Sequence, residues 1–235
     1  MSAGGRAPLL LLPGSLCDAW LWHHQAAALG VDHEVLVPEV LQHDTLAAMA
    51  HAVLEHAPAV FALAGFSMGG RIALEVVRAA GARVTRLALL DASVHPVKDG
   101  EAARRQQMLD LALHAGMRAV ADIWVPRMVP APRHTDAGLM QGLRAMHARF
   151  SPEAYAMEMH ALLNRPDARE VLPLIRVPTL IMAGRLDPIS TPAQNEALTA
   201  QIPGARLELV DDCGHFLPLE APQAVTAALR RWLET

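Results

Sequence analysis

Short apolar runs alternate along the chain with longer segments in which apolar residues recur every three or four positions. Leu87-Ala88-Leu89-Leu90 shows the character of these runs, which are typical of strands buried on both faces. Strands that alternate with helices in this way form a parallel sheet flanked by helices. We expect about six strands, over Pro8–Leu12, His33–Val37, Ala59–Ala64, Leu87–Leu90, Val177–Ala183 and Arg206–Val210.

The segments between the runs predict helices with one buried face each. Thr191-Pro192 is typical of a helix start, because a capping side chain is followed by proline at the first helical position, and Pro222 starts the last helix. The predicted fold is therefore α/β, with a mostly parallel, doubly wound sheet and helices on both faces. The expected buried stripes are Leu46, Met49 and Val53; Ile72, Val76 and Ala80; Leu198 and Ile202; and Val225, Leu229 and Trp232.

One stretch, residues 95–169, interrupts this alternation, because its pattern is helical without a clear strand. We interpret it as a helical cap over the carboxyl ends of the strands, inserted into a core of residues 1–94 and 170–235. The cap holds seven of the 11 Met residues, and methionine fills irregular space, so these side chains suit a substrate pocket. For any single Met, packing of helix against helix is the favoured interpretation.

Composition excludes several classes of function. The net charge is −4 with His neutral, so the chain lacks the basic field that nucleic acids and anionic membranes attract. No apolar run reaches the roughly 18 residues of a membrane-spanning helix, and Leu9–Leu12 is too short for a signal peptide. Two cysteines do not make a disulfide framework. We expect a cytoplasmic protein with free thiols and no nucleic-acid or membrane partner.

The segment Gly65-Phe66-Ser67-Met68-Gly69 carries the strongest chemical signal. It follows a predicted strand and opens a predicted helix, which is the setting of a G-x-S-x-G nucleophile elbow. Such a turn holds the serine in a strained backbone conformation, at a cost of about 1–3 kcal/mol, and lifts its hydroxyl above the sheet edge. Gly65 and Gly69 let the strand and the helix approach closely. The alternative is a glycine-rich helix start with a capping serine.

A nucleophilic serine needs a base, and the chain has 12 His. His215 is favoured because it lies between the last predicted strand and the last predicted helix, at the edge where doubly wound sheets place their sites. No histidines show the spacing of a metal site, so a zinc enzyme is not expected. Surface or core-edge positions are the simplest interpretation of His23, His24, His51, His56, His114, His147 and His160.

The base in turn needs an orienting carboxylate. Asp187 follows the fifth predicted strand, and the chain order Ser67, Asp187, His215 is typical of this kind of triad. We favour Asp187 and expect Asp91 to cap the turn into the helical insertion. The competing carboxylates near strand ends are Asp91, Asp211 and Asp212.

The loop after the first predicted strand is a candidate for part of an oxyanion hole. In such a site the backbone N–H groups of Met68 and of either Ser15 or Leu16 converge on one oxygen. The sequence does not choose between Ser15 and Leu16. Both cysteines also fall near this site, and burial as small apolar residues is the favoured interpretation of Cys17 and Cys213.

These motifs together resemble the α/β-hydrolase superfamily, in particular its small, cap-bearing bacterial enzymes. The resemblance implies a triad of Ser67, Asp187 and His215, an acyl-enzyme route, and no cofactor or metal. The chain departs from many relatives at Pro13, where they have His, and it shows no counterpart of their first two antiparallel strands. The matching motifs, in order, are Leu12-Pro13-Gly14 followed by Trp20 or Trp22, Gly65-Phe66-Ser67-Met68-Gly69-Gly70-Arg71, Leu90-Asp91, Ala183-Gly184-Arg185-Leu186-Asp187 and Gly214-His215-Phe216.

The residues and the resemblance indicate a serine hydrolase that acts on a small carboxylic ester, lactone or related acyl compound. Such a small-molecule substrate needs an apolar pocket, walled by the cap and by residues beside the nucleophile and the base. The sequence leaves the acyl group, the leaving group and the oligomeric state open. The candidate pocket residues are Phe66, Trp124, Met128, Met157 and Phe216.

Two further classes of function remain as alternatives. Gly69-Gly70-Arg71 is also similar to the menaquinone-pathway synthase that eliminates pyruvate, and a hydrolase of C–C bonds is a further enzyme alternative. That synthase uses the triad as a base, and its polycarboxylate substrate requires a cluster of arginines. The other class is a non-catalytic ligand receptor on the same fold. The cap arginines available for a cluster are Arg104, Arg105, Arg118, Arg127, Arg133, Arg144 and Arg149.

Overall fold

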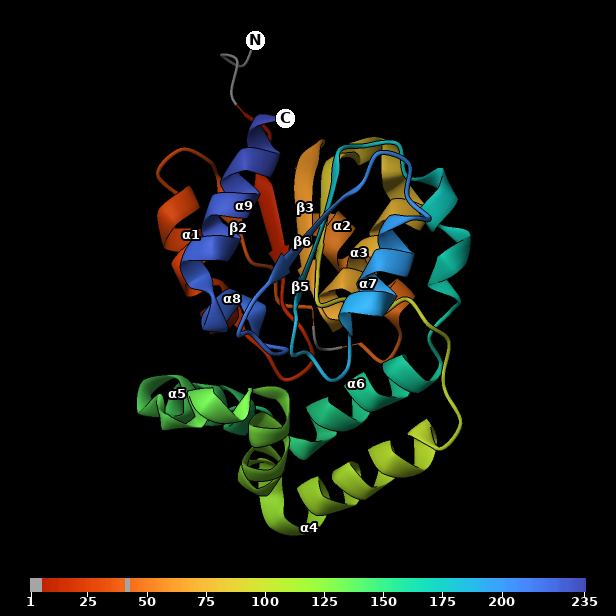
Figure 1. Ribbon diagram of the computed structural model, residues 1–235. Helices are drawn as coiled ribbons and strands as arrows, with labels where there is room; N and C mark the ends of the chain where they lie inside the picture. Colours follow the sequence, from red (N-terminus) through yellow and green to blue (C-terminus); the bar gives the residue numbers. More distant parts are fainter. Residues whose placement is uncertain (1–5, 41–42) are drawn as a thin grey trace.

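Six parallel strands form the centre of the molecule in the computed structural model, which describes residues 6–40 and 43–235 (Figure 1). The strand order is β2-β1-β3-β4-β5-β6, so the chain reverses its direction of travel across the sheet after β2. The fold predicted from the apolar runs is confirmed. The strands are β1 (Leu9–Leu12), β2 (Val35–Leu36), β3 (Phe61–Phe66), β4 (Val84–Leu90), β5 (Thr179–Gly184) and β6 (Arg206–Val210).

The boundaries of β2, β3 and β4 differ most from the expected ones, and those of β1 and β5 differ by one or two residues. β3 continues to Phe66, directly before Ser67, because its last residues pair with both β1 and β4. β4 begins at Val84, before its continuous apolar run, because Val84 pairs with Phe61 across the sheet. β2 is reduced to the two residues that pair with β1, which is typical of a sheet edge.

Helices cover both faces of the sheet, as predicted (Figure 1). On one face lie α2 (Leu46–His56), α3 (Met68–Ala80) and α7 (Pro192–Thr199), and on the other lie α1 (His23–Leu29), α8 (Leu217–Glu220) and α9 (Pro222–Glu234). Thr191 caps α7 and forms a reciprocal capping box with Gln194. Short 3₁₀ turns occur at Ala19–Trp22, Gly81–Arg83, Ala131–Thr135, Ala168–Glu170 and Leu172–Leu174.

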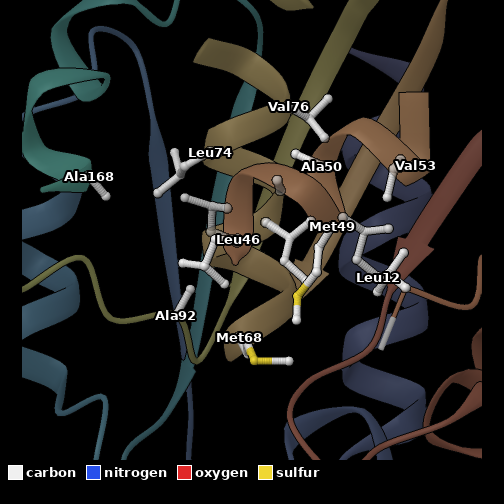
Figure 2. Close-up of a cluster of buried hydrophobic side chains, with 14 of the residues drawn as sticks. Leu12, Leu46, Met49, Ala50, Val53, Met68, Leu74, Val76, Ala92 and Ala168 are labelled. Carbon is white, nitrogen blue, oxygen red and sulfur yellow. The ribbon is translucent and has the colours of Figure 1, made fainter. Parts of the chain in front are cut away.

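Successive residues of the central strands face opposite sides of the sheet and so build two apolar cores. In β1, Leu10 and Leu12 belong to the core under α2 and α3, whereas Leu9 and Leu11 belong to the core under α1 and α9. All four are buried, and burial of such a side chain stabilises the fold by about 1.5–3 kcal/mol. Figure 2 shows the first core, which contains the predicted α2 stripe of Leu46, Met49 and Val53.

Three helices between β4 and β5 lie over the carboxyl ends of the strands (Figure 1). They are α4 (Glu101–Met128), α5 (Ala137–Ala148) and α6 (Pro152–Leu163), and α4 is interrupted at Gly116, whose φ is 81°. All three fall within residues 95–169. The division into this cap and a core of residues 1–94 and 170–235 stays a prediction. Residues 1–5 of that core lie outside the described part of the chain. Five of the seven Met residues pack as buried core residues, namely Met117, Met128, Met140, Met146 and Met159. Within residues 6–40 and 43–235, no helix has the length and apolar character needed to cross a membrane.

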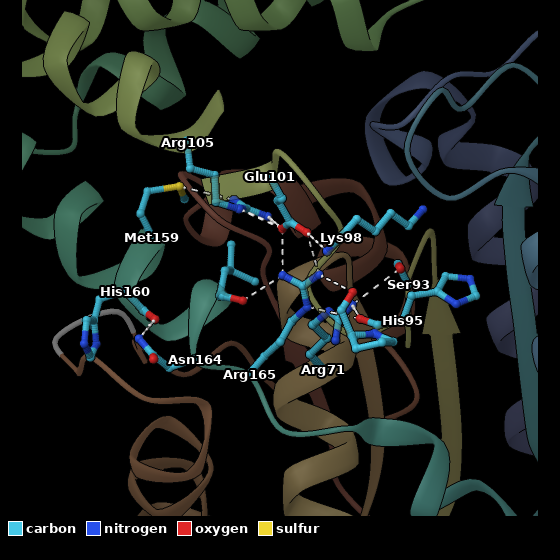
Figure 3. Close-up of polar contacts among 12 residues, drawn as sticks. Arg71, Ser93, His95, Lys98, Glu101, Arg105, Met159, His160, Asn164 and Arg165 are labelled. Carbon is cyan, nitrogen blue, oxygen red and sulfur yellow. Dashed lines mark hydrogen bonds and ion pairs between the residues drawn. The ribbon is translucent and has the colours of Figure 1, made fainter. Parts of the chain in front are cut away.

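A polar cluster ties the two connections of these helices together (Figure 3). The Arg165 guanidinium, after α6, donates to Glu101 at the start of α4 through Nη1 at 2.6 Å and Nη2 at 2.8 Å, and to the carbonyl oxygens of His95 and Pro96. Arg105 also donates to Glu101, through Nε at 2.9 Å. Glu101 is therefore the anion that holds two guanidinium groups at the base of the cap.

We expect Glu101→Gln to lower the free energy of unfolding by about 2 kcal/mol at pH 7, because it leaves the largely buried Arg165 without its counter-charge. Burial raises the pKa of Glu101, but hydrogen bonds from Arg165, from the Lys98 N–H and from Arg105 lower it to about 2. The stabilisation is thus present above the unfolded pKa of roughly 4.3 and is lost as the pH falls towards 2.

Urea unfolding of the wild type and the variant at pH 7 and pH 3 measures this difference. The control is Glu196→Gln, an exposed glutamate on α7, which we expect to change stability by less than about 0.5 kcal/mol. An equal difference for Glu101→Gln at both pH values would contradict the expectation.

Candidate active site

Ser67 occupies the sharp turn between β3 and α3, with φ of 52° and ψ of −115°. The turn is tight: a Cβ on Gly65 would lie 2.3 Å from the Gly69 carbonyl oxygen, and one on Gly69 would lie 2.4 Å from the Leu12 carbonyl oxygen. Glycine is therefore required at both positions. The Ser67 side chain makes no capping hydrogen bond to α3, so the alternative of a simple capping serine is wrong.

The Ser67 hydroxyl instead faces the predicted base. Its Oγ lies 3.0 Å from His215 Nε2, and His215 Nδ1 lies 2.8 Å from Asp187 Oδ2. Because the carboxylate can only accept, Nδ1 carries the proton of the neutral imidazole, and Nε2 is left to accept from the serine hydroxyl. The structure thus brings together the three residues that the sequence singled out, in the geometry of a Ser-His-Asp triad.

Asp187 is held in place by more than His215. Its Oδ1 accepts from the backbone N–H groups of Ile189 at 2.7 Å and Ser190 at 3.1 Å. Burial raises the pKa of this carboxyl, but the charge and hydrogen bond of His215 and the two backbone hydrogen bonds outweigh it and lower the pKa. Asp187 therefore stays ionised beside the imidazole.

Asp91 lies next to this pair but does not orient the base. Its Oδ1 accepts from the Gly184 N–H at 3.0 Å, so the expectation that Asp91 caps the turn into the cap is wrong. Burial and the negative charge of Asp187 raise the pKa of Asp91, which favours its neutral form. The remaining alternatives, Asp211 and Asp212, are exposed.

One cluster of metal-ligating groups occurs in the described part of the chain. Asp91, Asp187 and His215 offer three ligand atoms that all lie within 4.8 Å of one another. Hydrogen bonds account for this closeness, because Asp187 binds His215 and two backbone N–H groups, and Asp91 binds the backbone of β5. The arrangement is that of a hydrogen-bonded acid–base pair.

The predicted oxyanion donors lie directly after the nucleophile, at Met68, and on the loop after β1. The loop after β1 abuts the elbow, since a Cβ on Gly14 would lie 3.1 Å from Ser67 Cβ. Among the described residues, none accepts a hydrogen bond from the N–H of Met68 or of Ser15. The Leu16 N–H, in contrast, donates to a side-chain carboxyl at 3.0 Å. Of the two loop candidates, Ser15 is therefore the one with its N–H available.

That carboxyl belongs to Glu158, a residue that the sequence analysis missed. Glu158 lies on α6 of the cap, is fully buried, and also accepts from the Ser15 hydroxyl. A signal was present in the sequence, because Glu158 falls between Tyr155 and Leu162 on the buried stripe of its helix. Glu220 was missed too; its carboxyl accepts from the N–H groups on either side of His215, those of Gly214 and Phe216.

The five candidate pocket residues differ in how close they lie to the base. The ring centroids of Phe66 and Phe216 lie 5.2 and 5.9 Å from that of His215. Met128 is buried in the same apolar cluster, and its carbonyl oxygen accepts from the His215 N–H at 2.9 Å. Trp124 packs against this cluster from a half-buried position. Met157 is half-buried on α6 and belongs to neither described core.

One further histidine and both cysteines are buried. His147, expected at the surface or core edge, is fully buried on α5, and its ring packs edge-on against Phe216. Burial lowers the pKa of His147 to about 4, so it is neutral. Cys17 and Cys213 are free and buried, as expected, and burial raises the pKa of both thiols.

The sequence pattern of the alpha/beta hydrolase family matches residues 9–229. The chain therefore belongs to this family, and the resemblance seen in its motifs is confirmed. It is a hydrolase-type enzyme built on one parallel sheet with helices on both faces.

Several relatives match over nearly their full lengths. The chain is 27% identical to the pimeloyl-[acyl-carrier protein] methyl ester esterase of Aromatoleum aromaticum, over 93% of this chain and 94% of the relative. A solved thermophilic esterase from Thermogutta terrifontis is 27% identical, with a TM-score of 0.87 over 99% of this chain and 91% of the other. The solved enol-lactonase of Burkholderia xenovorans LB400 is 26% identical, with a TM-score of 0.85 over 100% and 94%.

The two buried aspartates give a direct test of the hydrogen-bond geometry. We expect Asp187→Asn to slow labelling of Ser67 by a fluorophosphonate about 10⁴-fold, because the amide no longer holds the Nδ1–H tautomer of His215. The matched variant Asp91→Asn keeps an acceptor for the Gly184 N–H, and we expect less than a tenfold change. Labelling rates, with circular dichroism to check folding, measure both. An Asp91→Asn loss as large as that of Asp187→Asn would contradict the assignment.

Proposed function

We propose that this protein is a serine hydrolase that cleaves a small carboxylic ester, lactone or related acyl compound through an acyl-enzyme. The observation that carries the proposal is the chain of hydrogen bonds from Ser67 through His215 to Asp187. The relatives support the proposal, because they include enzymes named methyl ester esterase, esterase and enol-lactonase.

In the proposed mechanism, His215 Nε2 takes the proton of the Ser67 hydroxyl as Oγ attacks the substrate carbonyl. The carboxylate of Asp187 stabilises the imidazolium that forms. His215 then gives the proton to the leaving oxygen, and the acyl group stays on Ser67 Oγ. A water molecule, deprotonated by the same Nε2, attacks the acyl-enzyme and releases the acid.

The negative charge of the tetrahedral intermediate requires donors on the far side of the reacting carbon. The N–H groups of Met68 and Ser15 are the proposed donors, since both lie beside Ser67 and neither is used by another described residue. Met68 also opens α3, so the positive end of a helix dipole faces the oxyanion. One well-placed donor of this kind contributes about 3 kcal/mol to transition-state stabilisation.

The side chains beside the base favour an apolar acyl group. Phe66 and Phe216 flank the His215 ring, and Met128 lies in the same buried cluster. The cap arginines do not favour the polycarboxylate substrate of the pyruvate-eliminating synthase, because several are already paired with protein carboxylates. The observed pairs are Arg105 with Glu101, Arg133 with Asp136, Arg144 with Asp122, and Arg149 with Asp18.

Stopped-flow assays with p-nitrophenyl esters, from acetate to octanoate, test the proposal. We expect a burst of p-nitrophenol equal to the enzyme concentration, followed by steady turnover. Ser67→Ala is expected to abolish the burst and to lower kcat at least about 1,000-fold, because no covalent acyl-enzyme can form. Thr135→Ala, which removes an exposed hydroxyl that donates to the Pro132 carbonyl oxygen, is the control for loss of a hydroxyl and should keep both phases.

Absence of Ser67-dependent release at every chain length would contradict the proposed function. Retained tight binding of acyl compounds without turnover would then favour the receptor. Release of pyruvate from a polycarboxylate substrate would favour the synthase.

A further inference from the structure

A buried acid of the cap contacts the loop that carries one of the proposed oxyanion donors. The loop forms a turn from Gly14 to Cys17, closed by a hydrogen bond from the Cys17 N–H to the Gly14 carbonyl oxygen at 3.1 Å. Leu16 sits in this turn with φ of 54°, a left-handed conformation that a branched side chain disfavours. Such a conformation persists only where the surroundings hold it.

Glu158 supplies that hold. Its carboxyl accepts from the Leu16 N–H, at 3.0 Å to Oε2 and 3.3 Å to Oε1, and from the Ser15 hydroxyl. Glu158 thus binds the peptide group that directly follows the Ser15 N–H. Within the described part of the chain, no cationic side chain pairs with Glu158. The cost of burying this acid is offset only by its two contacts with the loop.

We propose that Glu158 is a positioning residue for hydrolysis: its buried carboxyl fixes the Ser15–Leu16 peptide so that the Ser15 N–H faces the oxyanion formed at Ser67. The inference rests on the proposed function. It makes the oxyanion hole a joint product of core and cap, because the Ser15 loop belongs to the core and Glu158 to α6. A donor displaced by a fraction of an ångström loses most of its effect on the transition state.

The charge of Glu158 also affects the stability of the oxyanion. Burial raises its pKa to about 8, against the opposing hydrogen bonds from Ser15 and Leu16. Below this pH the acid is neutral and keeps the Leu16 N–H on one oxygen. Its own O–H then donates to the Ser15 hydroxyl oxygen, whereas the ionised carboxylate accepts from the Ser15 hydroxyl. Above it, a buried anion beside the Ser15 loop opposes the negative charge of the oxyanion. Activity therefore falls as the pH rises through about 8.

The other titratable and charged groups near Glu158 lie on the loop after β1, on α6 and on α4. On the loop, burial raises the pKa of the Cys17 thiol, and Asp18 beyond it is paired with Arg149. On α6, burial raises the pKa of Tyr155 to about 12. On α4, Arg105 faces Tyr155 and is paired with Glu101. The raised pKa values of Cys17 and Tyr155 keep the thiol and the phenol neutral between pH 7 and 9.

Glu158→Gln and Glu158→Ala separate the hydrogen bonds from the charge. Steady-state hydrolysis of p-nitrophenyl butyrate is measured from pH 6.5 to 9.5, with the Ser67→Ala rate subtracted. We expect Glu158→Ala to lower kcat about 100-fold with KM changed less than about threefold, because a transition-state donor is misplaced. Glu158→Gln should stay within about fivefold of wild type at pH 7 and should lack the decline near pH 8, since an amide bonds but does not ionise.

Two further variants keep the test decisive. Glu153→Gln changes an exposed glutamate on the same helix, and we expect it to match the wild type at every pH. Ser15→Ala keeps the backbone N–H and removes one partner of Glu158, and we expect an intermediate loss in kcat. If Glu158→Ala does not fold, the pH profiles of Glu158→Gln and Ser15→Ala decide.

Two outcomes overturn the inference while leaving the proposed function intact. One is a Glu158→Gln profile that declines near pH 8 as the wild type does. The other is a folded Glu158→Ala enzyme with kcat within twofold of wild type. Absence of any Ser67-dependent turnover in the wild type is a different result, because it overturns the proposed function and the inference together.

Discussion

The backbone at Ser67 is the constraint on which the rest of the site depends. Its positive φ lies in a region that disfavours a side chain, and the close contact of β1, β3 and α3 keeps it there. Leu16, Asp91 and Asp212 share this left-handed conformation, and they are the other non-glycine residues of the described chain that do so. Each follows a parallel strand of the sheet. Backbone strain is therefore concentrated at the carboxyl edge, where the reacting groups meet.

Two helices between β4 and β5 contact the site loops through hydrogen bonds to backbone groups. Glu158 of α6 contacts the loop after β1, and the Met128 carbonyl oxygen at the end of α4 accepts from the His215 N–H. These contacts reach the two loops that carry the proposed donor and the base. At the other side of the cap, Arg165 and Glu101 join its two connections. A displacement of the cap would thus change the geometry on both sides of Ser67.

Much of this architecture could be predicted because it rests on local signals. Short continuous apolar runs predicted the strands, helical spacing predicted the helices, and Gly65 and Gly69 around Ser67 located the elbow. The chain order favoured Asp187 over Asp91, although both follow strands, and the structure adds that Asp187 contacts His215 whereas Asp91 contacts the Gly184 N–H. Glu158 was missed for a different reason: its partners Ser15 and Leu16 lie more than 140 positions away, and pattern analysis does not pair such distant residues.

Four buried acids around the site accept backbone hydrogen bonds, and their pKa values are shifted in different directions. Glu158, Asp187 and Glu220 each accept from backbone N–H groups of the site loops, and Asp91 accepts from the N–H of Gly184 at the end of β5. Burial raises the pKa of three of them, whereas His215 and the backbone hydrogen bonds lower that of Asp187. One imidazolium, that of His215, forms during the proposed reaction, and the carboxylate of Asp187 balances its positive charge. Additional anions would oppose the oxyanion, so burial, which favours the neutral forms of Asp91, Glu158 and Glu220, acts in the same direction as the proposed chemistry.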